Sequence, residues 1–179
     1  MTSTVSSTSS SIPSGRIAGG VAPVRLDALL ALDADTLGAM YASARVPRLA
    51  DVRGDLRGRM LATTVLGGRS ARAIRALASS DAFPWRGKTF TPGESDRGAG
   101  INRVVRDRWH LYRFETFIGR SRAGDFDALQ LDYDNEDNPF FIRPIKDEMR
   151  ELSPDLWLGQ AYVQLPRAAH LVLYFGLAR

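Results

Sequence analysis

The sequence contains no cysteine, so disulfides, thiolate metal sites and cysteine nucleophiles are excluded. Histidine occurs only twice, which excludes a histidine-rich metal site, and we expect neither a metal nor another cofactor. No apolar run approaches the roughly 20 residues of a membrane-spanning helix. Residues 1–15, which are rich in serine and threonine, also lack the basic and apolar regions of a secretory signal. These absences predict a cytoplasmic protein with no membrane partner.

Lysine occurs only at positions 88 and 146, so the basic charge behind the formal net charge of +4 is nearly all arginine. We interpret these arginines mainly as a solvated surface. Arg103, Arg106 and Arg108 lie close to Trp109 and Tyr112, and arginines with aromatic rings can clamp and stack single-stranded bases. A single-strand nucleic-acid binder is therefore an outside alternative, although no recognised nucleic-acid motif surrounds these residues.

The length of 179 residues and an apolar content of 44% allow one hydrophobic core. We interpret residues 1–22 as a disordered polar leader and residues 23–179 as a single domain. Apolar residues at helical spacing predict two short helices within about 25–44, broken near Asp33. Either Asp33 or Asp35 is a natural N-cap for the second helix. We expect these helices to lie against the outside of a sheet.

From about residue 51 onward, short apolar or alternating stretches are separated by turn-forming residues, which predicts many strands. The expected strands cover 52–60, 83–90, 101–107, 109–118, 126–133, 156–165 and 170–177, with a further strand or turn over 142–149. In the first strand Gly54 and Gly58 share one face with Leu56, and their missing side chains allow a bulky neighbour to approach closely. This pattern predicts a mainly β fold, a single antiparallel β-barrel with short N-terminal helices.

The strand predicted over 109–118 carries aromatic and ionisable residues on both faces. His110 and Phe114 lie on one face, whereas Arg113 and Glu115 share the other with apolar neighbours. A strand exposed on one side would have apolar residues on one face only, so we expect neither face to be plainly solvent. Such a strand is typical of the wall of a small-molecule pocket.

Several ionisable residues could carry chemistry in such a pocket. His110 cannot share a face with Glu115 on a regular strand, so Tyr112 is its better partner for proton transfer. Arg113 and Glu115 form either an ion pair or a site for a carboxylate or enolate oxygen of a ligand. Lys146 and Asp147, with Asp132 or Asp134, form either an acid/base set or an ordinary solvated pair. The candidate catalytic residues are His110, Tyr112, Arg113, Glu115, Asp132 and Lys146. The candidate ligand-binding residues are Leu56, Met60, Trp85, Phe114, Tyr133, Trp157 and Tyr162.

Two short motifs resemble a known family. Gly54-Asp55-Leu56-Arg57-Gly58 resembles the signature of the bacterial GXWXG domain, with Leu56 where the family has tryptophan, and Trp85-Arg86-Gly87-Lys88-Thr89-Phe90 is similar to the W-x-G-K-x-F that follows it. In that family a domain of unknown function usually comes next. Four segments of this chain occur in the same order as in that domain: Tyr133-Asp134, Pro144-Ile145-Lys146-Asp147, Leu158-Gly159-Gln160-Ala161 and Leu173-Tyr174-Phe175-Gly176-Leu177. The resemblance covers about residues 51–179 and implies a small calycin or lipocalin-like barrel without established catalytic residues.

The sequence thus predicts a barrel that encloses a small, largely apolar molecule. One hypothesis is a carrier or sequestering protein that does no chemistry. The other is a cofactor-independent isomerase, cyclase or lyase of bacterial secondary metabolism, in which the barrel holds a flexible substrate in a reactive conformation. Buried charge would be costly and without use in a purely apolar carrier, which favours the second hypothesis. The sequence also leaves a homodimer open.

Overall fold

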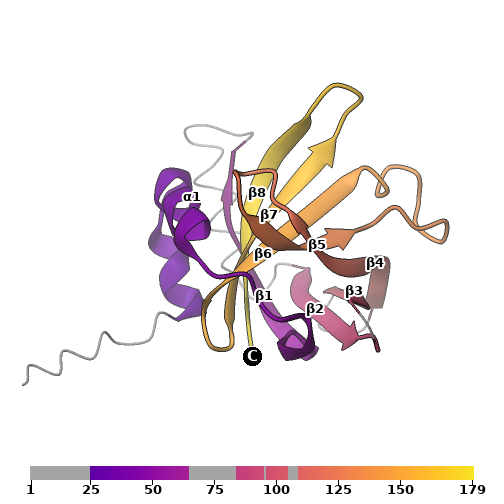
Figure 1. The fold of residues 1–179 in the computed structure, drawn as a ribbon, viewed down its shortest axis with the longest axis horizontal. Coiled ribbons are helices and arrows are strands. Elements are labelled where there is room, and N and C mark those ends of the chain that lie inside the picture. Colours follow the sequence, from indigo (N-terminus) through magenta and orange to yellow (C-terminus); the bar gives the residue numbers. More distant parts are fainter. Residues whose placement is uncertain (1–24, 65–83, 95, 105–108) are drawn as a thin grey trace, which may run out of the picture.

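A computed structural model describes residues 25–64, 84–94, 96–104 and 109–179. Within these residues, eight antiparallel strands follow one another around a closed barrel, and the last strand pairs with the first (Figure 1). The strands are β1 (Gly54–Thr63), β2 (Trp85–Pro92), β3 (Arg97–Val104), β4 (Trp109–Arg120), β5 (Asp127–Asp132), β6 (Ile145–Ser153), β7 (Leu156–Gln164) and β8 (Ala169–Ala178). The predicted mainly β fold, a single antiparallel barrel, is confirmed. The predicted leader over 1–22 lies outside the described residues.

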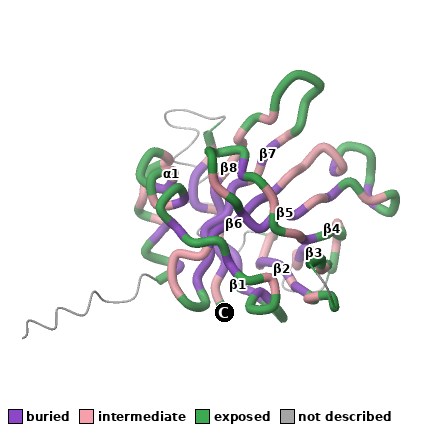
Figure 2. The backbone as a smooth tube through the Cα atoms, in the orientation of Figure 1, coloured by how far each residue is buried: buried purple, intermediate pink, exposed green. Residues whose placement is uncertain are grey.

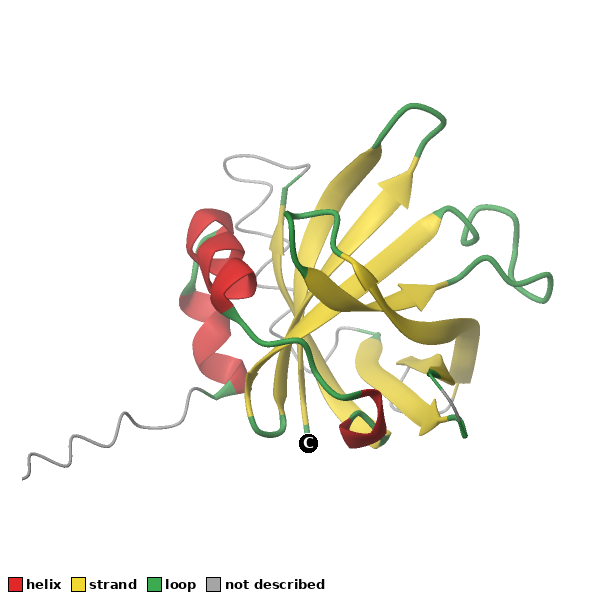
Figure 3. Ribbon diagram, viewed as in Figure 1, coloured by secondary structure: helices red, strands yellow, loops and turns green. Residues whose placement is uncertain are grey.

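The N-terminal helices cover one outer side of the barrel, as Figure 3 shows in red. They are the 3-10 helix η1 (Leu26–Ala31) and the α-helix α1 (Ala34–Ser43), and a further 3-10 turn, η2 (Leu49–Asp51), precedes β1. Of the two predicted N-caps, Asp33 caps α1, because its side chain accepts a hydrogen bond from the Thr36 amide at 2.8 Å. Leu29 and Leu37 are buried with residues of the outer barrel face, such as Leu158.

The barrel interior has two halves. The half toward η2 is filled with a packed core that includes Leu56, Phe90, Phe114, Trp157 and Leu177. The other half lies toward the ends of β1, β3, β5 and β7 and contains a cavity. Figure 2 shows the buried residues gathered in the barrel and beneath the helices, with exposed residues along the loops.

The two faces of β4 differ more than the sequence predicts. Phe114 and Thr116 point into the barrel and are almost fully buried. Arg113 and Glu115 are exposed, and Trp109 at the start of the strand is 58% exposed. The expectation that neither face meets solvent is therefore wrong, because Arg113 and Glu115 on the outward face are exposed.

A group of buried polar side chains lies between the outer barrel face and α1. Glu148 of β6, which is fully buried, accepts hydrogen bonds from the Tyr41 hydroxyl at 3.2 Å and the Ser121 hydroxyl at 2.6 Å. The Arg122 amide and guanidinium and the Gln130 amide also donate to it. Burial and the Glu148 charge raise the pKa of Tyr41, so the phenol keeps its proton and acts as a donor. We call Tyr41, Ser121, Arg122, Gln130 and Glu148 the Glu148 cluster.

Gly58 in β1 confirms the prediction that a missing side chain admits a bulky neighbour. A Cβ atom at this position would lie 2.5 Å from the Trp85 ring and 2.6 Å from the Gly87 Cα atom. The Trp85 ring can therefore occupy its position in the barrel only because residue 58 has no side chain. Gly54, which the sequence placed on the same face, has no such neighbour.

We expect the Gly58→Ala substitution to lower the free energy of unfolding by about 1–3 kcal/mol, because overpacking forces the Trp85 ring and the β2 backbone to shift. Urea unfolding followed by circular dichroism measures this change. An unchanged urea midpoint would contradict this prediction, because it would show that the neighbouring residues move to admit the methyl group without loss of stability.

None of the helices in the described part of the chain is long and apolar enough to cross a membrane.

Candidate functional site

A cavity of about 270 Å³ occupies the half of the barrel that the packed core does not fill. Its walls come from every strand except β5, with two further residues from the segment between β5 and β6. Most of the lining is apolar or aromatic, as is usual for small-molecule sites. The lining residues are Met60, Trp85, Lys88, Asn102, Val104, Tyr112, Tyr133, Ile142, Ile145, Asp147, Ala161, Leu173 and Phe175.

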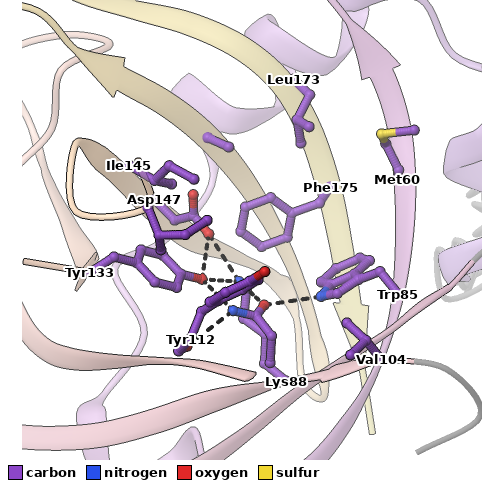
Figure 4. A pocket seen from close by; sticks show the side chains of 13 residues that line it. Met60, Trp85, Lys88, Val104, Tyr112, Tyr133, Ile145, Asp147, Leu173 and Phe175 are labelled. Atoms are coloured by element: carbon purple, nitrogen blue, oxygen red, sulfur yellow. Dashed lines mark hydrogen bonds and ion pairs between the residues drawn. The ribbon is translucent and has the colours of Figure 1, made fainter. Parts of the chain in front are cut away.

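The polar residues of the cavity form one hydrogen-bonded group, which we call the Lys88 cluster: Lys88, Asn102, Tyr133 and Asp147. Lys88 Nζ donates to the Asn102 Oδ1 atom at 2.8 Å, to the Tyr133 hydroxyl at 2.5 Å and to the Asp147 Oδ2 atom at 3.0 Å. Tyr133 also donates to Asp147 Oδ2 at 3.1 Å. Figure 4 shows Lys88 of β2, Tyr133 from the segment after β5 and Asp147 of β6 pointing toward one another. The cluster spans the barrel between the cavity and the packed core.

Burial dominates the electrostatics of this cluster. Lys88 and Asp147 are only 3% and 5% exposed. Burial lowers the pKa of Lys88, whereas the neighbouring Asp147 opposes this change by stabilising the ammonium form. The rings of Trp85, Phe114, Tyr133 and Phe175 lie 5.2–5.5 Å from Lys88 Nζ and also favour the cation. Burial and the Asp147 charge raise the pKa of Tyr133 well above its ordinary value, so the phenol keeps its proton and acts as a hydrogen-bond donor.

Two β-bulges bring aromatic residues into the cavity. In β2 the register with β3 shifts between Trp85 and Gly87, so that Trp85 joins Lys88 on the inner face. Its indole N–H donates to Asn102 at 3.1 Å. In β4 the extra residue is Tyr112, which has a positive φ of 62° and lines the cavity. Both bulges lie at the cavity end of their strands.

The predicted ligand-binding residues occupy three different places. Met60, Trp85 and Tyr133 line the cavity. Leu56, Phe114 and Trp157 belong to the packed core of the barrel. Tyr162 points to the outer side, where its hydroxyl donates to Gln160 at 2.8 Å, and it does not line the cavity.

Of the predicted catalytic residues, Tyr112 alone lines the cavity. His110 is exposed, because the bulge at Tyr112 reverses the order of faces and places His110 opposite Arg103 on the outside. The predicted pairing of His110 with Tyr112 therefore does not form. Arg113 is exposed, and Glu115 forms an exposed ion pair with Arg97 at 3.1 Å.

Lys146 and Asp132 form an ion pair with each other across β5 and β6 and do not line the cavity. This is the ordinary surface pair that the sequence left open as an alternative to an acid/base set. The arginines considered for nucleic-acid binding are only partly described, because Arg106 and Arg108 lie outside the described residues.

The sequence analysis missed Lys88 and Asn102 as site residues, and it weighed Asp147 beside Lys146 without selecting it. Lys88 had two signals: it shares strand parity with the buried Phe90, and it is one of two lysines in an arginine-rich chain. Asp147 was passed over for its neighbour Lys146, although successive strand residues point to opposite faces and only one of them could enter the barrel. Nothing in the sequence around Asn102 indicates its hydrogen-bond partners, so it could not be identified as a site residue.

The chemistry available in the cavity is hydrogen bonding and proton transfer. Lys88 donates to Tyr133, and both donate to the Asp147 carboxylate within one network, so donors that can exchange protons lie beside a carboxylate that can accept one. In the described ranges no group of three or more histidine, aspartate and glutamate side chains is placed to hold a metal ion.

No family model matches the chain, and no curated protein matches it. Among solved structures, the chain is similar to a crystal structure of a protein from Thermomonospora curvata. The two share 18% sequence identity over 83% of this chain and 88% of the other, with a TM-score of 0.49. The fold is compatible with a ligand-binding barrel.

Proposed function

We propose that this protein binds a small, largely apolar molecule inside its barrel. The observation that carries the proposal is the cavity of about 270 Å³, whose walls are mainly apolar and aromatic side chains. A barrel interior without a ligand role is normally filled by side chains, as the other half of this barrel is. The binding energy would come mainly from removing apolar surface of the ligand from water.

The second candidate function is a cofactor-independent isomerase, cyclase or lyase. It is favoured by the Lys88 cluster, because buried charge has an energetic cost that apolar binding alone does not require. In this function the walls hold the substrate in a reactive conformation, and Asp147 accepts a proton from one position and returns it to another. Catalysis of this kind needs only the proton transfers that the network already contains.

The resemblance to the GXWXG domain and its trailing domain is also a proposal. It is supported by the position of the residues that carry it, because Lys88, Tyr133 and Asp147 come from three separate motifs and meet in one cluster. Gly58 from the first motif makes room for Trp85 from the second. The resemblance adds no reaction to the proposal.

Native mass spectrometry of protein purified from the extract of its own host tests the binding function. We expect a retained apolar metabolite, which can then be identified. If incubation with fresh protein changes the chromatographic retention of this metabolite, the enzymatic function holds, and an unchanged metabolite supports the carrier. Protein that retains nucleic acid, or no small molecule under any condition, would contradict the proposal.

Filling the cavity should abolish binding without loss of stability. We expect the Ala161→Phe substitution, which places a ring among the lining residues, to weaken binding of the metabolite at least tenfold while Tm stays equal or rises. Ala168→Phe, in the exposed loop between β7 and β8, is the matched control and should bind normally. Equal affinity of both variants would place the ligand outside the barrel.

A further inference from the structure

One polar atom of the Lys88 cluster has no partner. Asp147 Oδ2 accepts hydrogen bonds from Lys88 and Tyr133, but Asp147 Oδ1 is buried and accepts none from the described residues. In Figure 4 one carboxylate oxygen lies at the dashed bonds and the other points away from them. An unpaired buried carboxylate oxygen is costly, and Asp147 lines the cavity, so a hydrogen bond from a bound molecule to this atom would offset that cost.

The cluster offers no free donor of its own. The three protons of Lys88 Nζ go to Asn102, Tyr133 and Asp147. The Asn102 amide donates to the Tyr112 carbonyl and the Tyr133 hydroxyl, and the Trp85 indole N–H is held by Asn102. A ligand that meets this cluster must therefore donate a hydrogen bond rather than accept one.

The charge of the cluster further limits the ligand. Lys88 and Asp147 neutralise each other within the wall, and the remaining walls carry no ionised side chain. A cationic ligand would bring an uncompensated charge into an apolar cavity, and an anionic ligand would be repelled by the Asp147 carboxylate and find no free donor in the Lys88 cluster. A neutral ligand avoids both costs, and its polar group must be a donor to pair with Asp147 Oδ1.

We propose that the cavity takes a neutral, largely apolar molecule with a hydroxyl group, and that this hydroxyl donates to Asp147 Oδ1. This inference rests on the proposed binding function and names the class of its ligand. It replaces the carboxylate or enolate ligand that the sequence suggested for Arg113, which is exposed. Tyr112, which also lines the cavity and carries a hydroxyl, is the other residue that could select such a ligand, and the test must separate the two.

The test compares four molecules that share a naphthalene skeleton: 2-naphthol, naphthalene, 2-methoxynaphthalene and 2-naphthoate. Their affinities for the full chain are measured by equilibrium dialysis at pH 7, where 2-naphthol is neutral and 2-naphthoate is an anion. A hydrogen bond to a charged group contributes enough for about a tenfold or greater preference. We therefore expect 2-naphthol to bind at least tenfold more tightly than each of the other three.

Two variants assign the preference to one residue. Asp147→Asn should reduce it to less than about threefold, because the amide is a weaker acceptor. Tyr112→Phe, which keeps the ring and the cluster, should leave it unchanged. If Asp147→Asn does not fold, the Tyr112→Phe result still decides, since a preference that disappears in this variant belongs to Tyr112 and overturns the inference.

The remaining outcomes separate this inference from the binding function. Equal binding of 2-naphthol and naphthalene, blocked by Ala161→Phe, would overturn the hydroxyl ligand and leave the apolar pocket intact. Tightest binding of 2-naphthoate would also overturn it, because an anion needs a free donor. Failure of all four molecules to bind would count against the pocket itself.

Discussion

Replacing Asp147 with leucine is expected to lower the free energy of unfolding by about 3–5 kcal/mol, because the Lys88 ammonium would remain buried without its counter-ion. Both side chains are less than a tenth exposed, so solvent cannot take the place of the carboxylate. This loss is a large share of the roughly 5–15 kcal/mol that stabilises a domain. Equilibrium unfolding in urea, followed by circular dichroism and tryptophan fluorescence, measures it.

The double variant Lys88→Met/Asp147→Leu is the control for this prediction. It removes both charges and keeps similar volume, so we expect it to recover at least half of the lost stability, as apolar replacements of buried ion pairs often do. A single variant that costs less than about 1 kcal/mol would contradict the ion pair. It would mean that Lys88 is readily accommodated as the neutral amine, the direction in which burial shifts its pKa.

Much of the fold follows from sequence patterns that depend on local physics. The alternation predicted for β1 is preserved: Leu56, Gly58 and Met60 face the barrel interior, and the charged residues between them face outward. The continuous apolar run of β8 is explained by Phe175 pointing inward and Tyr174 packing beneath the helices. These patterns are reliable because they depend only on which face of a strand is buried. They do not depend on which strands pair with it.

The site was less predictable because it depends on departures from strand regularity. Strict alternation places Trp85 and Lys88 on opposite faces, and the bulge in β2 brings them together. The bulge at Tyr112 has the reverse effect on His110, which leaves the face it would share on a regular strand. A bulge depends on the register with the neighbouring strand, and the pattern of a single strand does not contain this information.

The partners of the Lys88 cluster are also distant in sequence. Lys88 and Asp147 are separated by 59 positions and become neighbours only because the barrel closes. The sequence shows each as one charged residue in a strand, and most such residues are solvated. Asp132 and Lys146 have equally favourable sequence surroundings, yet they pair on the outside.

Replacing Glu148 with alanine should be as damaging as the loss of Asp147, although Glu148 points out of the barrel. We expect the free energy of unfolding to fall by about 3–5 kcal/mol, because the substitution leaves a cavity and removes the acceptor shared by Tyr41, Ser121 and Arg122. Glu151→Ala on the same strand is the matched control. Its ion pair with the exposed Arg45 should be worth less than about 1 kcal/mol.

Hydrogen exchange shows where the Glu148→Ala loss occurs. The Glu148 cluster joins α1, through Tyr41, to the segment after β4, through Ser121 and Arg122. Amides of α1 should therefore exchange faster in the variant than amides of β7 and β8, which keep their barrel pairing. Uniform acceleration throughout the barrel would contradict a local role. It would mean that Glu148 stabilises the sheet itself, and that the helix is held mainly by the apolar contacts of Leu29 and Leu37.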